Sequence, residues 1–261
     1  MDPIRTIEPE VCKALRGVVF DVDDTLTRGG RLEALAYDAL WQLRDAGLAL
    51  IAVTGRPLGF AEWLARTFPL ELAVGENGAG YVRATEHGVT TGYVDDASSR
   101  AQQRATLDRV RARVARELPW ARESDDSWAR RCDLAYDIGE HERVSREKIA
   151  QLVALFEAEG TRAVVSSVHA HAAASDCDKA RGVVHAARVE LAQDLAAERE
   201  RWLFVGDSAN DAAAFAHFRL SAGVANVRDH LHGLPVPPRF VSDADRGRGF
   251  AEIARAVLER R

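Results

Sequence analysis

Hydrophobic residues in the first third of the chain alternate between short apolar runs and longer stretches with helical spacing. The first run, residues 16–20, is apolar and partly β-branched, and Asp21, Asp23 and Asp24 follow it directly. An apolar run without alternation is typical of a strand buried on both faces. Beyond it we predict a helix over residues 32–46, a strand over 48–53, a helix over 58–67 and a strand over 72–74. This order predicts a parallel sheet with right-handed crossover helices.

The pattern changes between about residues 81 and 174. We predict a long helix over residues 98–117, a strand over 131–138, a helix from 145 and a β-rich stretch over 163–171. Strands in this order suggest a small α+β domain. The parallel rhythm then resumes with a helix over 179–192, a strand over 202–205, a helix over 211–217, a strand over 220–225 and a helix from 250. We therefore predict an α/β domain of residues 1–82 and 175–261, interrupted by an α+β domain of residues 83–174.

Helical spacing also predicts which residues form the core. In the helix over 32–46, one face carries Leu35, Ala39, Leu40 and Leu43. The tryptophans at apolar helix or strand positions are predicted to lie in the core as well; they are Trp41, Trp63 and Trp202. Trp120 and Trp128 flank a polar loop of the inserted domain, where packing is the first interpretation and stacking on a sugar the alternative.

Composition excludes several classes of protein. The chain has 261 residues, 47% hydrophobic and 29% charged, which is typical of a folded globular protein. Its net charge is -5, and the arginine-rich stretch over residues 100–116 is interrupted by alanines and an acidic residue. We expect this stretch to be a solvated helix face and expect no nucleic-acid partner.

Cysteine spacing and the N-terminal sequence indicate a cellular compartment. Cys12, Cys132 and Cys177 are odd in number and widely separated, which favours neither a disulfide framework nor a CxxC metal site. The chain starts without a basic segment and apolar stretch, and no apolar run approaches membrane-spanning length. We expect a cytoplasmic protein without a membrane partner; the sequence sets no oligomeric state.

Candidate chemistry lies where the predicted parallel strands end, because ligands of such sheets bind at the carboxyl ends of strands. Asp21 can attack as a carboxylate nucleophile, and Asp23 can protonate the leaving oxygen and later activate water. A DxD motif alone is weak, since acids at a strand end also cap the next helix. Thr54 and the amide of Gly55 can bind phosphate oxygens, although Thr54 can also be a turn or cap residue.

Two further positions supply cationic and oxygen-rich groups. Lys179, at a predicted helix start, can offset the charge between phosphate and nucleophile, or it can be an exposed first-turn lysine. Asp207, Asn210 and Asp211 follow another buried strand and offer hard oxygen ligands that suit Mg²⁺. For Asn210 and Asp211, helix capping and metal contact both stay open. A cation is needed because a carboxylate nucleophile and a phosphate dianion repel each other.

Four segments in order, FDVDDTLT, VTGRP, CDKARG and FVGDSANDAAAF, resemble the four motifs of the haloacid dehalogenase superfamily of phosphatases. The resemblance implies a Rossmann-like core and Mg²⁺ as cofactor. It also implies roles for single residues: Asp21 as nucleophile, Asp23 as acid/base, Thr54 and Lys179 as phosphate ligands, and Asp21, Asp207 and the main-chain carbonyl of Asp23 as metal ligands, supported by Asn210 and Asp211.

The placement of the insertion, between Thr54 and Lys179, resembles the C2 caps of subfamily IIB, the Cof-like and sucrose-phosphate phosphatase group. The turns at residues 76–79 and 223–226 are also similar to that group. Two positions depart from its pattern. Asp24 stands where the group usually has glycine, and Lys179 precedes alanine where the group usually has a lysine-glycine pair.

Substrate contacts are expected from the cap. Strand parity separates Cys132, Leu134, Tyr136 and Ile138, which should pack on the cap helices, from Arg131, Asp133 and Asp137. Candidate substrate contacts are Arg56, Asn77, Arg131, Ser167 and His169; solvated or structural roles are the alternative. Arg56 and Glu76 can shape the pocket floor or form an ion pair. His169 and His171 also suggest a metal pair, but no third ligand is evident.

These features together predict a Mg²⁺-dependent phosphomonoester hydrolase that acts through an aspartyl-phosphate on a small phosphorylated metabolite. A cap with a polar face suits a sugar or polyol phosphate. The alternatives are a phosphosugar mutase, which returns the phosphate to the sugar, and a non-catalytic protein that binds sugar phosphates. A halide-releasing enzyme is disfavoured by Asp23, which such a reaction does not need.

Overall fold

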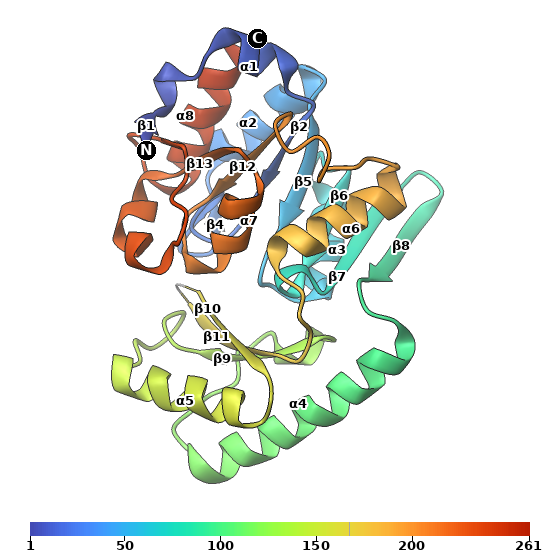
Figure 1. The fold of residues 1–261 in the computed structure, drawn as a ribbon, viewed down its shortest axis with the longest axis vertical. Helices are drawn as coiled ribbons and strands as arrows, with labels where there is room; N and C mark the ends of the chain where they lie inside the picture. The colour runs from blue at the N-terminus through green and yellow to red at the C-terminus, as the bar shows by residue number, and fades with distance from the viewer. Residues whose placement is uncertain (167) are drawn as a thin grey trace.

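The computed structural model describes residues 1–166 and 168–261, and its larger part is a nine-stranded sheet in the order β1-β14-β13-β12-β2-β5-β6-β7-β8 (Figure 1). Pairing is parallel from β1 to β6, and β7 and β8 are antiparallel. The strands are β1 Asp2–Pro3, β2 Gly17–Phe20, β5 Ala49–Val53, β6 Leu72–Gly75, β7 Gly80–Thr85, β8 Gly88–Tyr93, β12 Trp202–Gly206, β13 Leu220–Gly223 and β14 Phe240–Val241. The predicted parallel α/β core is confirmed.

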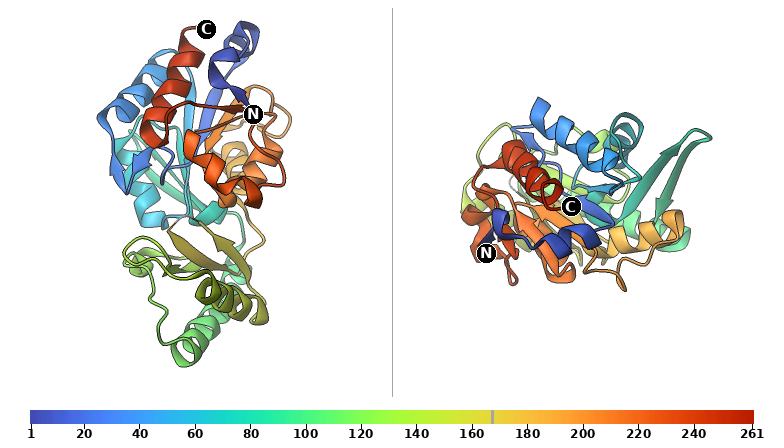
Figure 2. Two further views of the ribbon diagram at one scale, coloured as in Figure 1. Left: turned by 90° about the vertical axis from the view of Figure 1, so that its left-hand side faces the viewer. Right: turned by 90° about the horizontal axis from the view of Figure 1, so that it is seen from above.

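Helices cover both faces of this sheet (Figure 2). The helices α2 Ala34–Asp45, α3 Leu58–Thr67 and α8 Arg246–Leu258 pack on one face with α1 Pro9–Ala14, and α6 Lys179–Leu191 and α7 Ala212–His217 pack on the other. Strand parity divides the core accordingly: Val18 and Phe20 of β2 face the first group, and Val19 faces the second. Because both faces are buried, the strands show uninterrupted apolar runs.

A smaller α+β unit, the cap, lies at one end of the sheet (Figure 1). Its antiparallel sheet, in the order β10-β11-β9, is formed by β9 Asp133–Asp137, β10 Arg162–Val165 and β11 His169–Ala173. The helices α4 Ala97–Glu117 and α5 Arg146–Ala158 lie on the side away from the core. Leu134, Tyr136 and Ile138 pack with both helices, as parity predicts, whereas Cys132 joins the core of the larger domain.

The segment between the two units differs from the sequence-based expectation. Residue 82, the expected end of the first core segment, lies inside β7, which continues to Thr85 and pairs with β8 in the large sheet. The cap helix α4 begins only at Ala97, after the N-cap Asp96. Over these residues, which include several threonines and glycines, apolar and polar positions alternate only weakly. The pattern alone therefore does not distinguish a hairpin of the large sheet from a segment of the cap.

Several helix positions also differ. The hairpin of β3 Thr27–Arg28 and β4 Arg31–Leu32 precedes α2, which therefore begins at Ala34. On the buried face of α2, Ala36 takes the place expected for Leu35, which is 41% exposed. The C-terminal helix starts at Arg246, earlier than expected. Short 3-10 helices complete the fold: η1 Ile4–Thr6, η2 Glu76–Gly78, η3 Ser127–Ala129, η4 Ala209–Asp211 and η5 Ala225–Gly233.

The tryptophans separate into buried and exposed groups. Trp202 is fully buried, as predicted, but the core assignment of Trp41 and Trp63 is wrong, because they are 43% and 50% exposed. Small residues and leucines fill the buried stripe of each helix, and the two indoles lie beside it. All three cysteines are free thiols in buried positions. In the described part of the chain, no helix combines the length and apolar character needed to cross a bilayer.

Candidate active site

Four predicted site residues converge at the end of the large sheet that faces the cap. Asp21 follows β2, Thr54 follows β5 and Asp207 follows β12, three strands that are neighbours in the sheet. Parallel neighbours end at the same edge, so their terminal loops must meet. Lys179 joins them as the first residue of α6, which packs beside this edge. The structure thus brings together groups that are up to 186 residues apart in the sequence.

Lys179 is buried between two carboxylates. Its Nζ lies 2.6 Å from Asp21 Oδ1 and 2.7 Å from Asp211 Oδ1. Burial lowers the pKa of Lys179, but the carboxylates of Asp21 and Asp211 outweigh this effect and raise it above the ordinary value. The lysine therefore stays charged, and the exposed-lysine alternative is wrong.

The carboxylates outnumber this cation. Asp21, Asp207 and Asp211 present oxygen atoms within 4.8 Å of one another, the one cluster of three possible metal ligands in the described ranges. Burial raises the pKa of Asp21 to about 7. Burial, with the charges of Asp21 and Asp211, raises that of Asp207 well above its ordinary value. When all three are ionised, as a bound cation would favour, three carboxylates against one ammonium leave an excess of two negative charges, so hard oxygen donors and charge together fit Mg²⁺.

Neighbouring polar groups fix the orientation of Asp207. Thr25 Oγ1 donates to Asp207 Oδ1 at 3.2 Å, and Asn226 Nδ2 donates to Asp207 Oδ2 at 2.8 Å. Asp211 Oδ2 accepts the backbone N–H groups of Asp207 and Ser208 at 2.9 and 3.1 Å. Asp211 therefore both caps its helix and lies in the carboxylate cluster. The role of Asn226 was missed by sequence reasoning, although the turn at residues 223–226 was a signal for it.

Arg56 connects Asp23 to the cap. Its Nε and Nη2 donate to the Asp23 carboxylate at 3.0–3.1 Å, and Nη2 also lies 2.9 Å from Glu140 Oε1. The hydroxyl of Thr54 lies 3.5 Å from Asp23 Oδ2 and accepts the N–H of Arg56. Arg56 therefore pairs with Asp23 and Glu140, not with Glu76 as the sequence-based alternative suggested.

Asp24, where the related group has glycine, has a positive φ of 55°. Asparagine and aspartate tolerate this left-handed conformation better than other residues with a side chain. Arg246 Nε donates to Asp24 Oδ1 at 2.9 Å, so this carboxylate is paired with an arginine. The acid thus meets the backbone requirement of this tight turn without joining the carboxylate cluster.

Glu76 joins the cap to the core, a role that the sequence did not reveal. It is 3% exposed, and its carboxylate accepts the backbone N–H groups of Leu58, Arg131, Cys132 and Asp133. The first N–H belongs to α3 of the core and the others to the chain that enters β9. Burial and the Asp133 carboxylate raise the pKa of Glu76 to about 7.

The cap contributes a buried chain of charged residues. Arg130 Nη1 donates to Asp133 Oδ1 at 3.0 Å and to the carbonyl oxygen of Gly55 at 2.9 Å. Asp133 Oδ2 lies 2.9 Å from His171 Nδ1. Despite its burial, Asp133 has its pKa lowered to about 2, first by Arg130 and then by His171. Burial lowers the pKa of His171. The neutral imidazole thus donates from Nδ1, and its Nε2 is left beside Gly55.

The candidate substrate contacts are only partly brought to this site. Arg56 and His169 line the cavity above Asp21, and His169 Nε2 pairs with Glu140 at 2.8 Å. Asn77 is buried near Gly55, and its Oδ1 accepts from Asn210 at 3.3 Å. Arg131 is exposed and donates to Tyr93 at 3.2 Å, away from the cavity. Ser167 lies outside the described residues. Neither histidine belongs to a three-ligand cluster among those residues.

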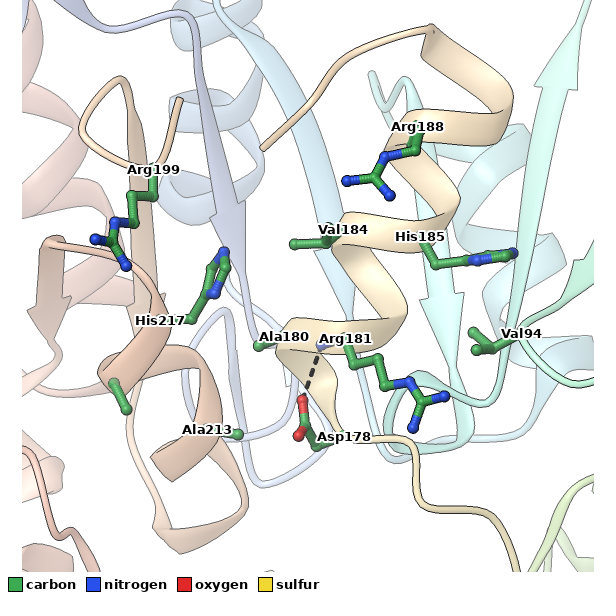
Figure 3. A pocket seen from close by; sticks show the side chains of 11 residues that line it. Val94, Asp178, Ala180, Arg181, Val184, His185, Arg188, Arg199, Ala213 and His217 are labelled. Atoms are coloured by element: carbon green, nitrogen blue, oxygen red, sulfur yellow. Dashed lines mark hydrogen bonds between the residues drawn. The ribbon is translucent and has the colours of Figure 1, made fainter. Parts of the chain in front are cut away.

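The cavities near the candidate site differ in volume from one another and from the largest cavity described. The cavity lined by Asp21, Asp23 and His171 has a volume of only about 20 Å³, enough for about one water molecule. Two cavities of about 450 and 360 Å³ border Asp23 and Arg56. The largest cavity described, about 650 Å³, lies between α6 and α7, where Arg188 and Arg199 extend into the gap (Figure 3). Asp21, Asp23 and Asp207 do not line it, so this cavity lies apart from the carboxylate cluster.

Known structures share this architecture. The solved structure of Thermoplasma acidophilum 0175 is similar, with a TM-score of 0.69 and 18% identity over 94% of this chain and 98% of that one. Sucrose-phosphatase from Synechocystis, solved with sucrose and phosphate, gives 0.67 and 16% over 94% and 98%. A trehalose-6-phosphate phosphatase related protein gives 0.59 and 17% over 93% and 96%. At these identities the similarity shows the fold, and it confirms the predicted core with an inserted cap.

Sequence comparison defines the family. No curated protein sequence matches the chain. The family model described as haloacid dehalogenase-like hydrolase matches residues 15–219, well over half of the chain. The matched segment includes Asp21, Thr54, Lys179 and Asp207, which the structure brings to one edge of the sheet. The predicted superfamily is confirmed, and the chain belongs to the haloacid dehalogenase-like hydrolases.

Proposed function

We propose that the protein is a Mg²⁺-dependent phosphomonoester hydrolase that forms an aspartyl-phosphate at Asp21. The observation that carries this proposal is the charge imbalance at the sheet edge, where three buried carboxylates share the single ammonium of Lys179. Such a cluster is costly unless a cation balances it. Asp21, Asp207 and the main-chain carbonyl of Asp23 would hold Mg²⁺, which when bound offsets the repulsion between the Asp21 carboxylate and a phosphate dianion.

In the proposed reaction, an Asp21 carboxylate oxygen attacks phosphorus, and the bond between phosphorus and the leaving oxygen breaks. Asp23 gives its proton to that oxygen. A water molecule then attacks the phosphorus of the aspartyl-phosphate while Asp23 takes its proton, which releases phosphate and restores Asp21. Thr54, Gly55 and Lys179 hold the non-bridging oxygens in both steps. Lys179, already 2.6 Å from Asp21, needs no movement to do so.

Asp23 must exchange partners during this cycle. Both oxygen atoms of its carboxylate accept hydrogen bonds from Arg56, and these contacts must give way before Asp23 can reach the leaving oxygen. Arg56 has further carboxylate partners in the cap, Glu140 at 2.9 Å and Asp126 at 3.6 Å. Since the cavity above Asp21 has room for only about one water, a phosphomonoester can enter only when the cap moves away from the core. That movement changes the contacts of Arg56.

A sugar or polyol phosphate is the substrate class that we propose. His169 and Glu140, a hydrogen-bonded pair, present polar groups from the cap beside Asp23 and Arg56. Sucrose-phosphatase and a trehalose-6-phosphate phosphatase related protein, both named for sugar phosphates, are among the similar structures. These similarities support the class and leave the individual substrate open.

The experiment that tests the function is a screen of phosphorylated metabolites, with Mg²⁺ and with a chelator. We expect free phosphate from at least one sugar or polyol phosphate, and we expect the chelator to abolish its release. Product analysis distinguishes the alternatives. An isomerised phosphosugar without free phosphate would indicate a mutase, and saturable binding without turnover would indicate a binding protein; either result would contradict the proposal.

A further inference from the structure

Two exposed tryptophans flank a groove at the seam between cap and core. Trp128, in η3 of the cap, is 87% exposed, and Trp63, in α3 of the core, is 50% exposed. Exposed indoles carry a large apolar surface in water, which folding alone does not favour. Both residues line the cavity of about 450 Å³, together with Pro57 and Phe60.

The packing of η3 on α3 brings the two indoles to the same groove. A Cβ atom at Gly59 would lie 3.6 Å from Ala129 Cβ, so the two elements approach closely at this point. Trp63 follows Gly59 by one helical turn and therefore lies on the same face of α3. Trp128 is the neighbour of Ala129 in η3. The groove thus has one aromatic wall from each domain.

The groove also reaches the proposed catalytic acid. Asp23 and Arg56 line both the groove and the small cavity above Asp21. In the proposed reaction, Asp23 touches the leaving oxygen, so the leaving group must extend from phosphorus on the side of Asp23. The groove opens on that side. The other cavity there, of about 360 Å³, is lined by Arg28 and Arg246 and offers no aromatic wall.

We propose that the leaving group of the substrate binds in this groove, and that it is a ring with one apolar face and hydroxyl groups along its edge, as in a pyranose. The inference rests on the proposed function and names the residues that select the substrate. The apolar face of the ring stacks on Trp63 and Trp128, while Asp126 and Glu140, which also line the groove, accept hydrogen bonds from the edge. An open-chain polyol offers no such face.

The kinetic test compares three esters, which are glucose 6-phosphate, glycerol 1-phosphate and phenyl phosphate. We expect Trp63→Ala and Trp128→Ala each to raise KM for glucose 6-phosphate about fivefold, the size of an aromatic contact, with kcat preserved. For glycerol 1-phosphate, kcat/KM should not change. Trp41→Ala is the matched control, because Trp41 is 43% exposed on α2 and does not line the groove. Equal losses on both esters, or none, would overturn the assignment.

The phenyl ester separates two kinds of ring. It has flat apolar faces but no hydroxyl groups on its edge. We expect its KM to rise in the two groove variants, as for glucose 6-phosphate, and its KM in the wild type to be higher than that of glucose 6-phosphate. If phenyl phosphate instead has the lower KM, the groove does not recognise a hydroxylated edge, and that part of the proposal is wrong.

A binding measurement keeps this inference separate from the proposed function. Glucose 6-phosphate is titrated into the Asp21→Asn protein, which should not turn it over, and tryptophan fluorescence is recorded. We expect a saturable change that is lost with Trp63→Phe and Trp128→Phe and kept with Trp41→Phe. If the wild type releases no phosphate but the fluorescence change persists, the proposed function is wrong and the groove assignment stands. If the wild type releases phosphate but the fluorescence change does not depend on Trp63 or Trp128, the groove assignment is wrong and the proposed function stands.

Discussion

The core and the cap both bring charged side chains to the candidate site, but they balance them differently. In the core, Asp21, Asp207 and Asp211 share one cation, Lys179. In the cap, Asp133 is paired with Arg130 and His171 at 3.0 and 2.9 Å. Glu140 is paired with Arg56 and His169 at 2.9 and 2.8 Å. Asp133 and Glu140 therefore each have an arginine partner, Arg130 of the cap and Arg56 of the core, whereas the three core acids share one lysine.

This difference indicates different uses. A compensated buried pair holds elements in position, and breaking it leaves an unpaired charge. In a cluster without enough cations, the acids repel one another and a bound cation would stabilise them. The pKa values of such acids rise, as those of Asp21 and Asp207 do. This difference supports the proposed function, in which the core cluster carries the chemistry on a charged ligand and the cap pairs hold the cap over it.

The largest effect is expected when the proposed nucleophile is neutralised. Asp21→Asn should reduce Mg²⁺-dependent phosphate release on the order of 10⁴-fold, because an amide does not attack phosphorus. The fold should persist, since the amide oxygen can still accept from Lys179. Phosphate release and circular dichroism measure the two effects. Asp38→Asn, at an exposed position of α2, is the control. Turnover that survives in Asp21→Asn would exclude nucleophilic attack by this residue.

The next largest effect is expected at Asp23. Asp23→Asn should slow both formation and hydrolysis of the aspartyl-phosphate by about 10²- to 10³-fold, because one residue serves as acid and base. Rapid-quench measurements of the two steps check this. Asp24→Asn is the matched control, since asparagine also adopts the left-handed conformation at this position. An unchanged rate in Asp23→Asn would show that the proton is exchanged elsewhere.

The role of Glu76 in holding the cap to the core can be tested by measuring stability. Glu76→Gln places an amide NH₂ group against backbone N–H donors, and it should lower the free energy of unfolding by about 3 kcal/mol. Urea denaturation gives this value. Glu71→Gln, on the core surface, should change it by less than about 0.5 kcal/mol. If the two variants were equally stable, Glu76 would not hold the cap to the core.

The smallest effect is expected in how the stability of the protein depends on pH. The folded-state pKa of Asp133, about 2, lies below the ordinary value of 3.8, so its ionised form stabilises the native state above pH 4. This stability is lost as the pH falls through 2. We expect Asp133→Asn to be about 2 kcal/mol less stable than the wild type at pH 6, with the gap narrowing toward pH 2. Urea denaturation across this range checks the sign, and a gap independent of pH would contradict it.

Much of the core site was predictable because its residues follow apolar strands. Asp21, Thr54 and Asp207 each end a run that the sequence identifies as a buried strand, and parallel topology places such ends at one edge. Lys179 needed the resemblance to known motifs in addition, because nothing local distinguishes it from a surface lysine. Its burial shows only in the folded chain.

The cap contacts were less predictable for a physical reason. Parity located Asp133 opposite the apolar face, but the partners of Asp133 depend on the register of β9 against β11 and on how the cap docks. Arg131 and Arg130 are adjacent in the sequence, and only docking decides that Arg130 is buried against Gly55 while Arg131 points to Tyr93. Similarly, helical spacing did not separate Trp63 from the buried stripe of α3.

Local periodicity and the order of the strands were enough to predict the parallel core, the inserted cap and the acids that carry the proposed chemistry. Which charges are compensated became evident only from the folded chain. Three contacts join segments that come together only in the folded chain. Glu76 accepts backbone N–H groups of the cap, and Arg56 bridges Asp23 to Glu140. Asp133 pairs with His171. Charge balance depends on distances in space, and sequence spacing does not specify those distances across a domain interface.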